Sequence, residues 1–126
     1  MVGKFTVLVV DDDQDVRDFV ATTLRKFGHE VLSAADGRNA IEMMKRQKPD
    51  LLITDYAMPG MTGADLAQAA RELNADQKIV YISGYADTDA LQKAAEDAPI
   101  LKKPFRVGEL FHVVEQSLSG GGPGPA

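Results

Sequence analysis

The chain has 126 residues, of which 44% are hydrophobic and 26% charged, so its composition is that of a globular protein and its length that of one domain. Its formal net charge of −5, without any lysine and arginine stripe, argues against direct binding to nucleic acid, and the absence of cysteine excludes thiol catalysis and cysteine-ligated zinc. No apolar run reaches the roughly 20 residues of a membrane helix, and the N-terminus lacks a signal peptide's cleavage region, so we expect a cytoplasmic protein without membrane contact.

Short aliphatic runs recur along the chain and predict five strands. They are FTVLVV (5–10), EVLSA (30–34), LLIT (51–54), KIVYIS (78–83) and ILK (100–102). Between them, apolar residues recur at helical spacing, as at Val16, Val20 and Leu24, and further helices are expected through Ala40–Met44, Leu66–Leu73, about 87–96 and 106–118. Alternating strands and helices, with strands apolar on both faces, predict an α/β fold in which helices cover both faces of a parallel sheet.

Glycine and proline support these boundaries. Gly28 follows Phe27 where a glycine commonly ends a helix, and Pro59-Gly60 marks the loop after the third strand. The segment SGGGPGPA (119–126) offers no side chains to bury. We therefore expect one domain over residues 1–118, followed by a disordered tail over 119–126.

Polar side chains follow four of the five predicted strands. The first strand runs into Asp11, Asp12 and Asp13, the third ends at Asp55 and the fourth at Ser83, and the fifth is followed by Lys103; the second ends in Ala34 and Ala35. Ligands of an open parallel sheet bind beyond the carboxyl ends of its strands, where the strand order reverses. We expect these polar side chains to meet there.

Clustered carboxylates repel one another unless a cation lies among them. Hard oxygen ligands at an open site suit Mg²⁺, which keeps several of its waters and binds one or two carboxylates. A lysine and a hydroxyl facing such a cluster can bind a phosphoryl group, whose transfer depends on positioning and charge neutralisation. The strand ends therefore predict a magnesium site that handles phosphate.

Four motifs carry a resemblance to a known family. In order, VLVVDDD, LLITDYAMPGMTG, YISGYA and LKKPF resemble the receiver domain of two-component response regulators, over about residues 5–118. The resemblance implies a flavodoxin-like, doubly wound sheet in the order 2-1-3-4-5, flanked by five helices. It also implies a phosphorylatable switch rather than an enzyme, with at most self-phosphorylation and slow autodephosphorylation.

The same resemblance implies roles for individual residues. Asp55 matches the phosphoacceptor, and Asp11 and Asp12 match the acidic pair that binds Mg²⁺ together with Asp55 and the backbone carbonyl of Ala57. Ser83 matches the switch hydroxyl. Lys103 matches the lysine that binds the phosphoryl group, before a proline whose preceding peptide is typically cis in the family.

The implied partners are a histidine kinase or histidine phosphotransfer protein and a downstream output domain or protein. The wording TDYAMPGMTG and DAPILKKPFR is most similar to receivers attached to hybrid sensor kinases. Two departures stand out: Ile100 occupies a position where receivers usually carry an aromatic residue, and MTG (61–63) replaces the usual MDG. The first puts coupling by a swinging aromatic ring in doubt.

Some of these residues also fit other interpretations. Asp13 and Asp15 fit the start of the next helix, where acidic side chains cap free N–H groups. An EF-hand over DDDQD fails because Val16 stands in place of the turn glycine and Thr22 in place of the bidentate glutamate. Lys102 competes with Lys103 for the cation's role, but only Lys103 precedes the proline.

The alternative function is a phosphatase of the haloacid dehalogenase type, because VVDDDQD, YISG and LKK echo that superfamily's aspartate, hydroxyl and lysine. Such enzymes need threonine or valine where Asp15 stands, and a further acidic motif after the lysine. They would also leave Asp55 without a role. His29 and His112 have no second ligand at helical spacing, and we expect them at surface or partly buried positions.

Overall fold

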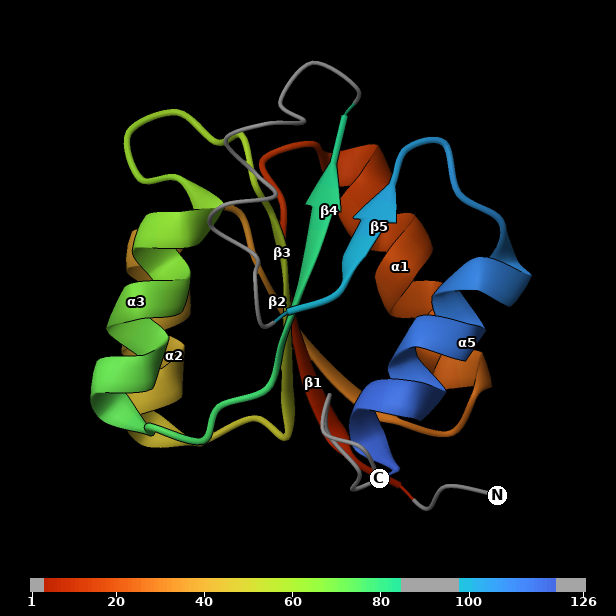
Figure 1. Ribbon diagram of the computed structural model, residues 1–126, viewed down its shortest axis with the longest axis horizontal. Coiled ribbons are helices and arrows are strands. Elements are labelled where there is room, and N and C mark those ends of the chain that lie inside the picture. The colour runs from red at the N-terminus through yellow and green to blue at the C-terminus, as the bar shows by residue number, and fades with distance from the viewer. Residues whose placement is uncertain (1–3, 85–97, 120–126) are drawn as a thin grey trace.

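The computed structural model describes residues 4–84 and 98–119, which form a five-stranded parallel sheet and four helices (Figure 1). The strands are β1 (Thr6–Val10), β2 (Glu30–Ala34), β3 (Leu51–Asp55), β4 (Ile79–Ser83) and β5 (Ile100–Lys102). The described helices are α1 (Gln14–Lys26), α2 (Gly37–Arg46), α3 (Gly63–Leu73) and α5 (Val107–Leu118).

The sheet has the order β2-β1-β3-β4-β5, with every neighbouring pair parallel. β1 therefore lies between β2 and β3, and the chain winds to one side of β1 through α1 and to the other side through α2. Val10 pairs with Ala34 of β2 and with Thr54 of β3, so the carboxyl ends of these three strands lie level with one another. The predicted doubly wound order is confirmed.

Alternation along each strand divides the core into two halves, one on each face of the sheet. In β1, Val7 and Val9 belong to one core cluster, and Leu8 and Val10 belong to the other. All four side chains are at most 1% exposed, which explains why β1 reads as an unbroken aliphatic run. β3 and β4 are buried along their whole length for the same reason.

Two helices cover each face. The cluster with Val7 and Val9 contains Val20 and Leu24 of α1 together with Leu110 of α5, whereas the cluster with Leu8 and Val10 takes its helical residues from α2 and α3. Figure 1 shows α1 and α5 on one side of the sheet and α2 and α3 on the other. This is the layered α/β architecture that the sequence predicts.

The helix boundaries follow their capping residues. The Asp13 side chain accepts hydrogen bonds from the backbone N–H groups of Asp15 and Val16 at the start of α1, so its predicted capping role is confirmed. Thr62 and Asp65 form a capping box at the start of α3. Gly28, with a φ of 98°, directly follows Phe27, the C-cap residue of α1, as predicted.

Three expectations have other outcomes. The helix expected at about 87–96 and the tail over 120–126 lie outside the described residues. His29, expected at a surface or partly buried position, is buried: the Phe5 N–H donates to its Nδ1 at 3.3 Å, and burial lowers its pKa. His112 is exposed, as expected. Among the described residues, no helix is long and apolar enough to cross a membrane.

Candidate functional site

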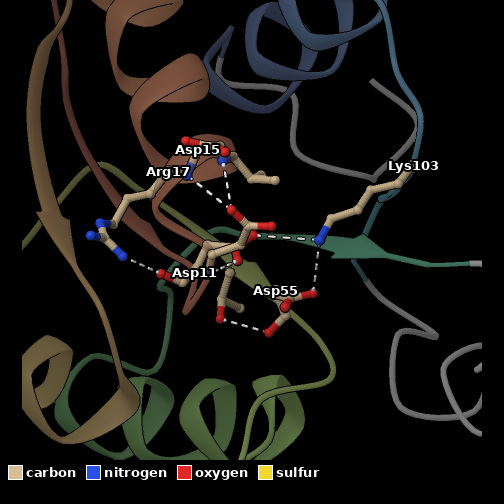
Figure 2. Close-up of polar contacts among 8 residues, drawn as sticks. Asp11, Asp15, Arg17, Asp55 and Lys103 are labelled. Atoms are coloured by element: carbon tan, nitrogen blue, oxygen red, sulfur yellow. Dashed lines mark hydrogen bonds and ion pairs between the residues drawn. The ribbon is translucent and has the colours of Figure 1, made fainter.

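The carboxyl ends of β1, β3 and β5 bring three charged side chains together. Asp11 follows β1, Asp55 is the last residue of β3, and Lys103 follows β5. The Lys103 side chain extends between the two aspartates (Figure 2), with its Nζ 3.7 Å from Asp11 Oδ2 and 3.8 Å from Asp55 Oδ1. One cation thus contacts two carboxylates, Asp11 and Asp55, that are far apart in the sequence.

The backbone around Lys103 distinguishes it from Lys102. The Lys103 N–H donates to the carbonyl of Ser83 at 2.8 Å, which extends the pairing of β5 with β4, and the Lys103–Pro104 peptide bond is cis. Lys102 is exposed, because successive side chains of a strand point to opposite faces. The structure therefore supports Lys103, and not Lys102, as the cation of the site.

Asp12 completes a group of three acidic residues. Carboxylate oxygens of Asp11, Asp12 and Asp55 all lie within 4.8 Å of one another, and this group could hold a metal ion. Asp11 is fully buried and Asp55 is 5% exposed, whereas Asp12 is exposed to solvent. The group is thus buried on its protein side and open toward water.

Burial makes this arrangement electrostatically costly. Desolvation, followed by the charge of Asp11, raises the pKa of Asp55 from 3.8 to about 6, although Lys103 acts in the opposite direction. Desolvation likewise raises the pKa of Asp11. Oδ2 of Asp11 is also buried without a hydrogen-bond partner. It forms an ion pair with Lys103, and a buried carboxylate oxygen without a hydrogen bond, among converging carboxylates, fits a divalent cation.

The loop after β1 is tied to the first turn of α1. Oδ1 of Asp11 accepts a hydrogen bond from the Asp13 N–H at 2.8 Å, and Asp13 caps the helix. The Arg17 side chain returns from α1, and its Nη1 donates to the Asp11 carbonyl at 2.8 Å (Figure 2). Arg17 could not be predicted from the sequence, because a contact to a backbone carbonyl leaves no motif.

Ser83 and Ala57 lie where the sequence predicts, but their roles stay predictions. Ser83 is the last residue of β4, is 1% exposed and is one residue beyond Ile82, which pairs with Asp55. Ala57 follows Asp55 by two residues, is exposed, and forms a backbone hydrogen bond to the Asp55 carboxylate that opposes the rise of its pKa.

Gly63 is the second residue that sequence reasoning missed. A Cβ built on Gly63 would lie 2.6 Å from the carbonyl oxygen of Asp55 and 2.8 Å from the Cα of Tyr56. The Gly63 N–H also donates to the Tyr56 carbonyl at 2.7 Å. The start of α3 therefore packs directly on the backbone that presents Asp55, and only a glycine allows this approach.

Replacing Gly63 with alanine should lower the free energy of unfolding by about 1–3 kcal/mol, because the new methyl group meets backbone rather than a flexible side chain. The matched control is Gly108→Ala in α5, where a Cβ would have no neighbour within 4 Å. That change should leave stability unchanged or raise it by up to about 1 kcal/mol. Urea unfolding of both variants measures the contrast, and equal stabilities would contradict the close approach at Gly63.

Known proteins match the chain in both sequence and fold. Residues 7–115 match the family described as the response regulator receiver domain. Among curated proteins, the chain is 36% identical over 118 residues to the response regulator receiver protein CpdR of Brucella abortus (strain 2308), covering 89% of this chain and 95% of that protein. It is also 33% identical over 120 residues to the sensor kinase CckA of the same strain, covering 92% of this chain but 13% of the kinase.

Solved structures agree with these matches. The receiver domain of NtrX from Brucella abortus is similar with a TM-score of 0.86 and 30% identity, over 90% of this chain and 98% of that one. The chemotaxis protein CheY4 of Vibrio cholerae is similar with a TM-score of 0.84 and 29% identity, over 94% and 100%. The chain spans nearly all of CpdR but 56% of the regulatory protein PhoB of Pseudomonas aeruginosa, so its relatives include small receivers and larger proteins. With its acidic group and shared lysine at the strand ends, the chain belongs to the response regulator receiver family, whose members are phosphoacceptor switches of two-component signalling.

Proposed function

We propose that Asp55 is the residue of this receiver that accepts the phosphoryl group. The observation that carries the proposal is the position of its carboxylate, buried at the end of β3, grouped with Asp11 and Asp12, and 3.8 Å from the Lys103 ammonium. Of the three carboxylates, that of Asp11 is fully buried and accepts a hydrogen bond from the Asp13 N–H, and that of Asp12 is exposed to solvent. Asp55 is the one that belongs to a strand, as the last residue of β3, and its carboxylate also lies next to the lysine.

The reaction is a displacement at phosphorus. A carboxylate oxygen of Asp55 attacks the phosphorus of a phosphohistidine, the P–O bond forms as the P–N bond breaks, and the imidazole leaves with the bonding electrons and takes up a proton. An acyl phosphate on Asp55 results. Although its pKa is raised to about 6, Asp55 is mostly ionised at neutral pH and available as the nucleophile.

Lys103 and Ser83 would then bind the new phosphoryl oxygens. Lys103 Nζ already lies close to Asp55 Oδ1, so a phosphoryl group added there falls within reach of the ammonium. Ser83 ends the strand next to β3, on the side of Asp55 toward β5. Both groups offer donors where negative charge accumulates during the transfer, which is the arrangement that stabilises such a transition state.

Asp11, Asp12 and Asp55, together with the carbonyl of Ala57, would hold Mg²⁺. The donor set is composed of hard oxygens, it is open to water on the side of Asp12, and it includes the buried Asp11 oxygen that has no hydrogen-bond partner. When bound, Mg²⁺ would neutralise charge on the carboxylates and on the incoming phosphate. Lys103 supplies a positive charge from the protein itself, with ion pairs to both Asp11 and Asp55.

Receiver membership implies a histidine kinase as partner. We propose that a histidine phosphotransfer protein can also donate the phosphoryl group. We further propose that the protein acts in the cytoplasm, where a downstream output domain or protein binds its phosphorylated state. Ile100 of β5 is half-buried and packs against the core cluster that contains Tyr81. Because a branched aliphatic side chain cannot swing as a ring does, we propose that the change reaches partners through the segment after Ser83 more than through β5.

Intact mass spectrometry after incubation with acetyl phosphate tests the function. In the presence of Mg²⁺ the protein should gain the mass of one phosphoryl group, and EDTA should prevent the gain. Continuous turnover of a generic phosphoester without a protein adduct would instead support a phosphatase of the haloacid dehalogenase type and contradict the receiver mechanism.

A further inference from the structure

We propose that Arg17 is a positioning residue for the metal site, which holds the peptide between Asp11 and Asp12 so that the Asp12 carboxylate converges with those of Asp11 and Asp55. The inference rests on the proposed role of the acidic group in binding Mg²⁺. The hydrogen bond of the Arg17 side chain goes to a backbone oxygen, the carbonyl of Asp11, and not to a carboxylate of the acidic group.

The contact fixes a specific part of the loop. The Asp11 carbonyl belongs to the planar peptide unit that joins Asp11 to Asp12, so anchoring its oxygen fixes the rotation of that plane. Arg17 Nη1 donates to this oxygen at 2.8 Å. The direction in which the Asp12 backbone and side chain leave β1 follows from that rotation.

Asp11 itself is held by two further hydrogen bonds. Its N–H donates to the Ala34 carbonyl at 3.3 Å, and its Oδ1 accepts from the Asp13 N–H at 2.8 Å. Asp12, in contrast, is an exposed residue at the open edge of the site. The Asp13 bond spans Asp12 from the side-chain oxygen of Asp11, and the Arg17 bond adds a constraint on the peptide that joins Asp11 to Asp12.

The chemistry of arginine suits this task. A hydrogen bond from a guanidinium to a carbonyl is charge-assisted and roughly twice as strong as one between neutral groups. Arg17 is half-buried on α1, and its own N–H donates to the Asp13 carbonyl at 3.0 Å, so the side chain starts from the same capped turn that it helps to hold. Figure 2 shows the guanidinium turned away from Lys103, on the far side of Asp11.

The same helix supplies a matched control. Arg25 of α1 also donates from its guanidinium to a backbone carbonyl six residues away, Nη2 to Val31 at 3.4 Å, but Val31 lies within β2, away from the acidic group. If Arg17 only ties α1 to the sheet, replacing either arginine should have the same kind of effect. If Arg17 positions the metal site, only its replacement should change Mg²⁺ affinity.

The experiment measures Mg²⁺ affinity by calorimetric titration, and the thermal unfolding of each protein without metal. The proteins compared are the wild type, Arg17→Met, Arg17→Lys, Arg25→Met and Asp12→Asn. Loss of a group that orients metal ligands typically weakens binding about 10- to 100-fold, and we expect Arg17→Met to weaken it about tenfold. Arg17→Lys should recover part of that loss, because lysine keeps one donor. Arg25→Met should melt lower but bind Mg²⁺ as the wild type does.

The outcomes separate this inference from the proposed function. Wild-type affinity in Arg17→Met, or equal losses in Arg17→Met and Arg25→Met, would overturn the positioning role. If Arg17→Met does not fold, Arg17→Lys takes its place, because lysine has a single, shorter donor instead of the guanidinium. Wild-type Mg²⁺ affinity in Arg17→Lys would then overturn the positioning role. A wild type that does not bind Mg²⁺, or an Asp12→Asn variant that binds it normally, would instead contradict the proposed metal site itself.

Discussion

Replacing Asp55 with asparagine should raise the melting temperature of the metal-free protein by roughly 10 °C at about pH 8. The carboxyl of Asp55 binds its proton more tightly in the folded protein than in the unfolded chain, because burial and Asp11 raise its pKa from 3.8 to about 6. At 1.36 kcal/mol per pH unit, this difference costs the ionised folded form up to about 3 kcal/mol. Asparagine keeps the shape of the side chain and removes its charge.

The sign of the effect gives it a characteristic pH dependence. Since the folded pKa is the higher one, the penalty is full above about pH 6 and is relieved as pH falls from about 6 toward 3.8. The difference in stability between Asp55→Asn and the wild type should therefore shrink across this window. Circular dichroism melts across the pH range measure it.

An exposed acid provides the control for Asp55→Asn. Glu42 of α2 is 60% exposed in its side chain and pairs with Lys45, so Glu42→Gln should change the free energy of unfolding by no more than about 0.5 kcal/mol. A destabilised Asp55→Asn variant, or a difference from the wild type that does not depend on pH, would show that repulsion within the acidic group is not what limits stability.

Replacing Lys103 with methionine should slow phosphorylation by acetyl phosphate about 10²- to 10³-fold, the usual loss when a donor to developing charge is removed. The ammonium that lies 3.7 Å from Asp11 and 3.8 Å from Asp55 disappears, while the length of the side chain is kept. The metal-free variant should also melt below the wild type, because the carboxylates lose the cation between them. The two predicted shifts in stability, upward for Asp55→Asn and downward for Lys103→Met, have one cause.

Lys102→Met is the matched control for Lys103→Met. Lys102 is the neighbouring residue on β5 and is exposed, so its replacement changes the net charge of the protein equally without touching the site. It should phosphorylate at close to the wild-type rate. If Lys102→Met and Lys103→Met slow the reaction by the same factor, the effect is one of general charge, and the assignment of Lys103 is wrong.

The strands and the residues at their carboxyl ends could be predicted because each leaves a local signal. A strand buried on both faces, such as β1 or β3, appears as an unbroken aliphatic run, and the aspartate that ends the run is then conspicuous. Asp13 could be assigned to capping because an acidic residue just before a helix satisfies free N–H groups. The strand order came from the resemblance to receivers.

Other features depend on contacts that no short motif encodes. Gly63 approaches the backbone of Asp55 and Tyr56 only after α3 packs back onto the end of β3, and Arg17 contacts Asp11 only after α1 forms. Nothing in the local sequence marks His29 as buried, but the pairing of β1 with β2 buries it next to Phe5. In each case tertiary packing, and not local propensity, decides the environment.

The central claim is that Asp55, and no other carboxylate of the acidic group, receives the phosphoryl group. Intact mass after incubation with acetyl phosphate and Mg²⁺ tests it most directly, with the wild type and Asp55→Asn compared side by side and circular dichroism used to confirm that the variant is folded. The account predicts one phosphoryl adduct on the wild type and none on Asp55→Asn. An adduct of equal occupancy on a folded Asp55→Asn protein would contradict it.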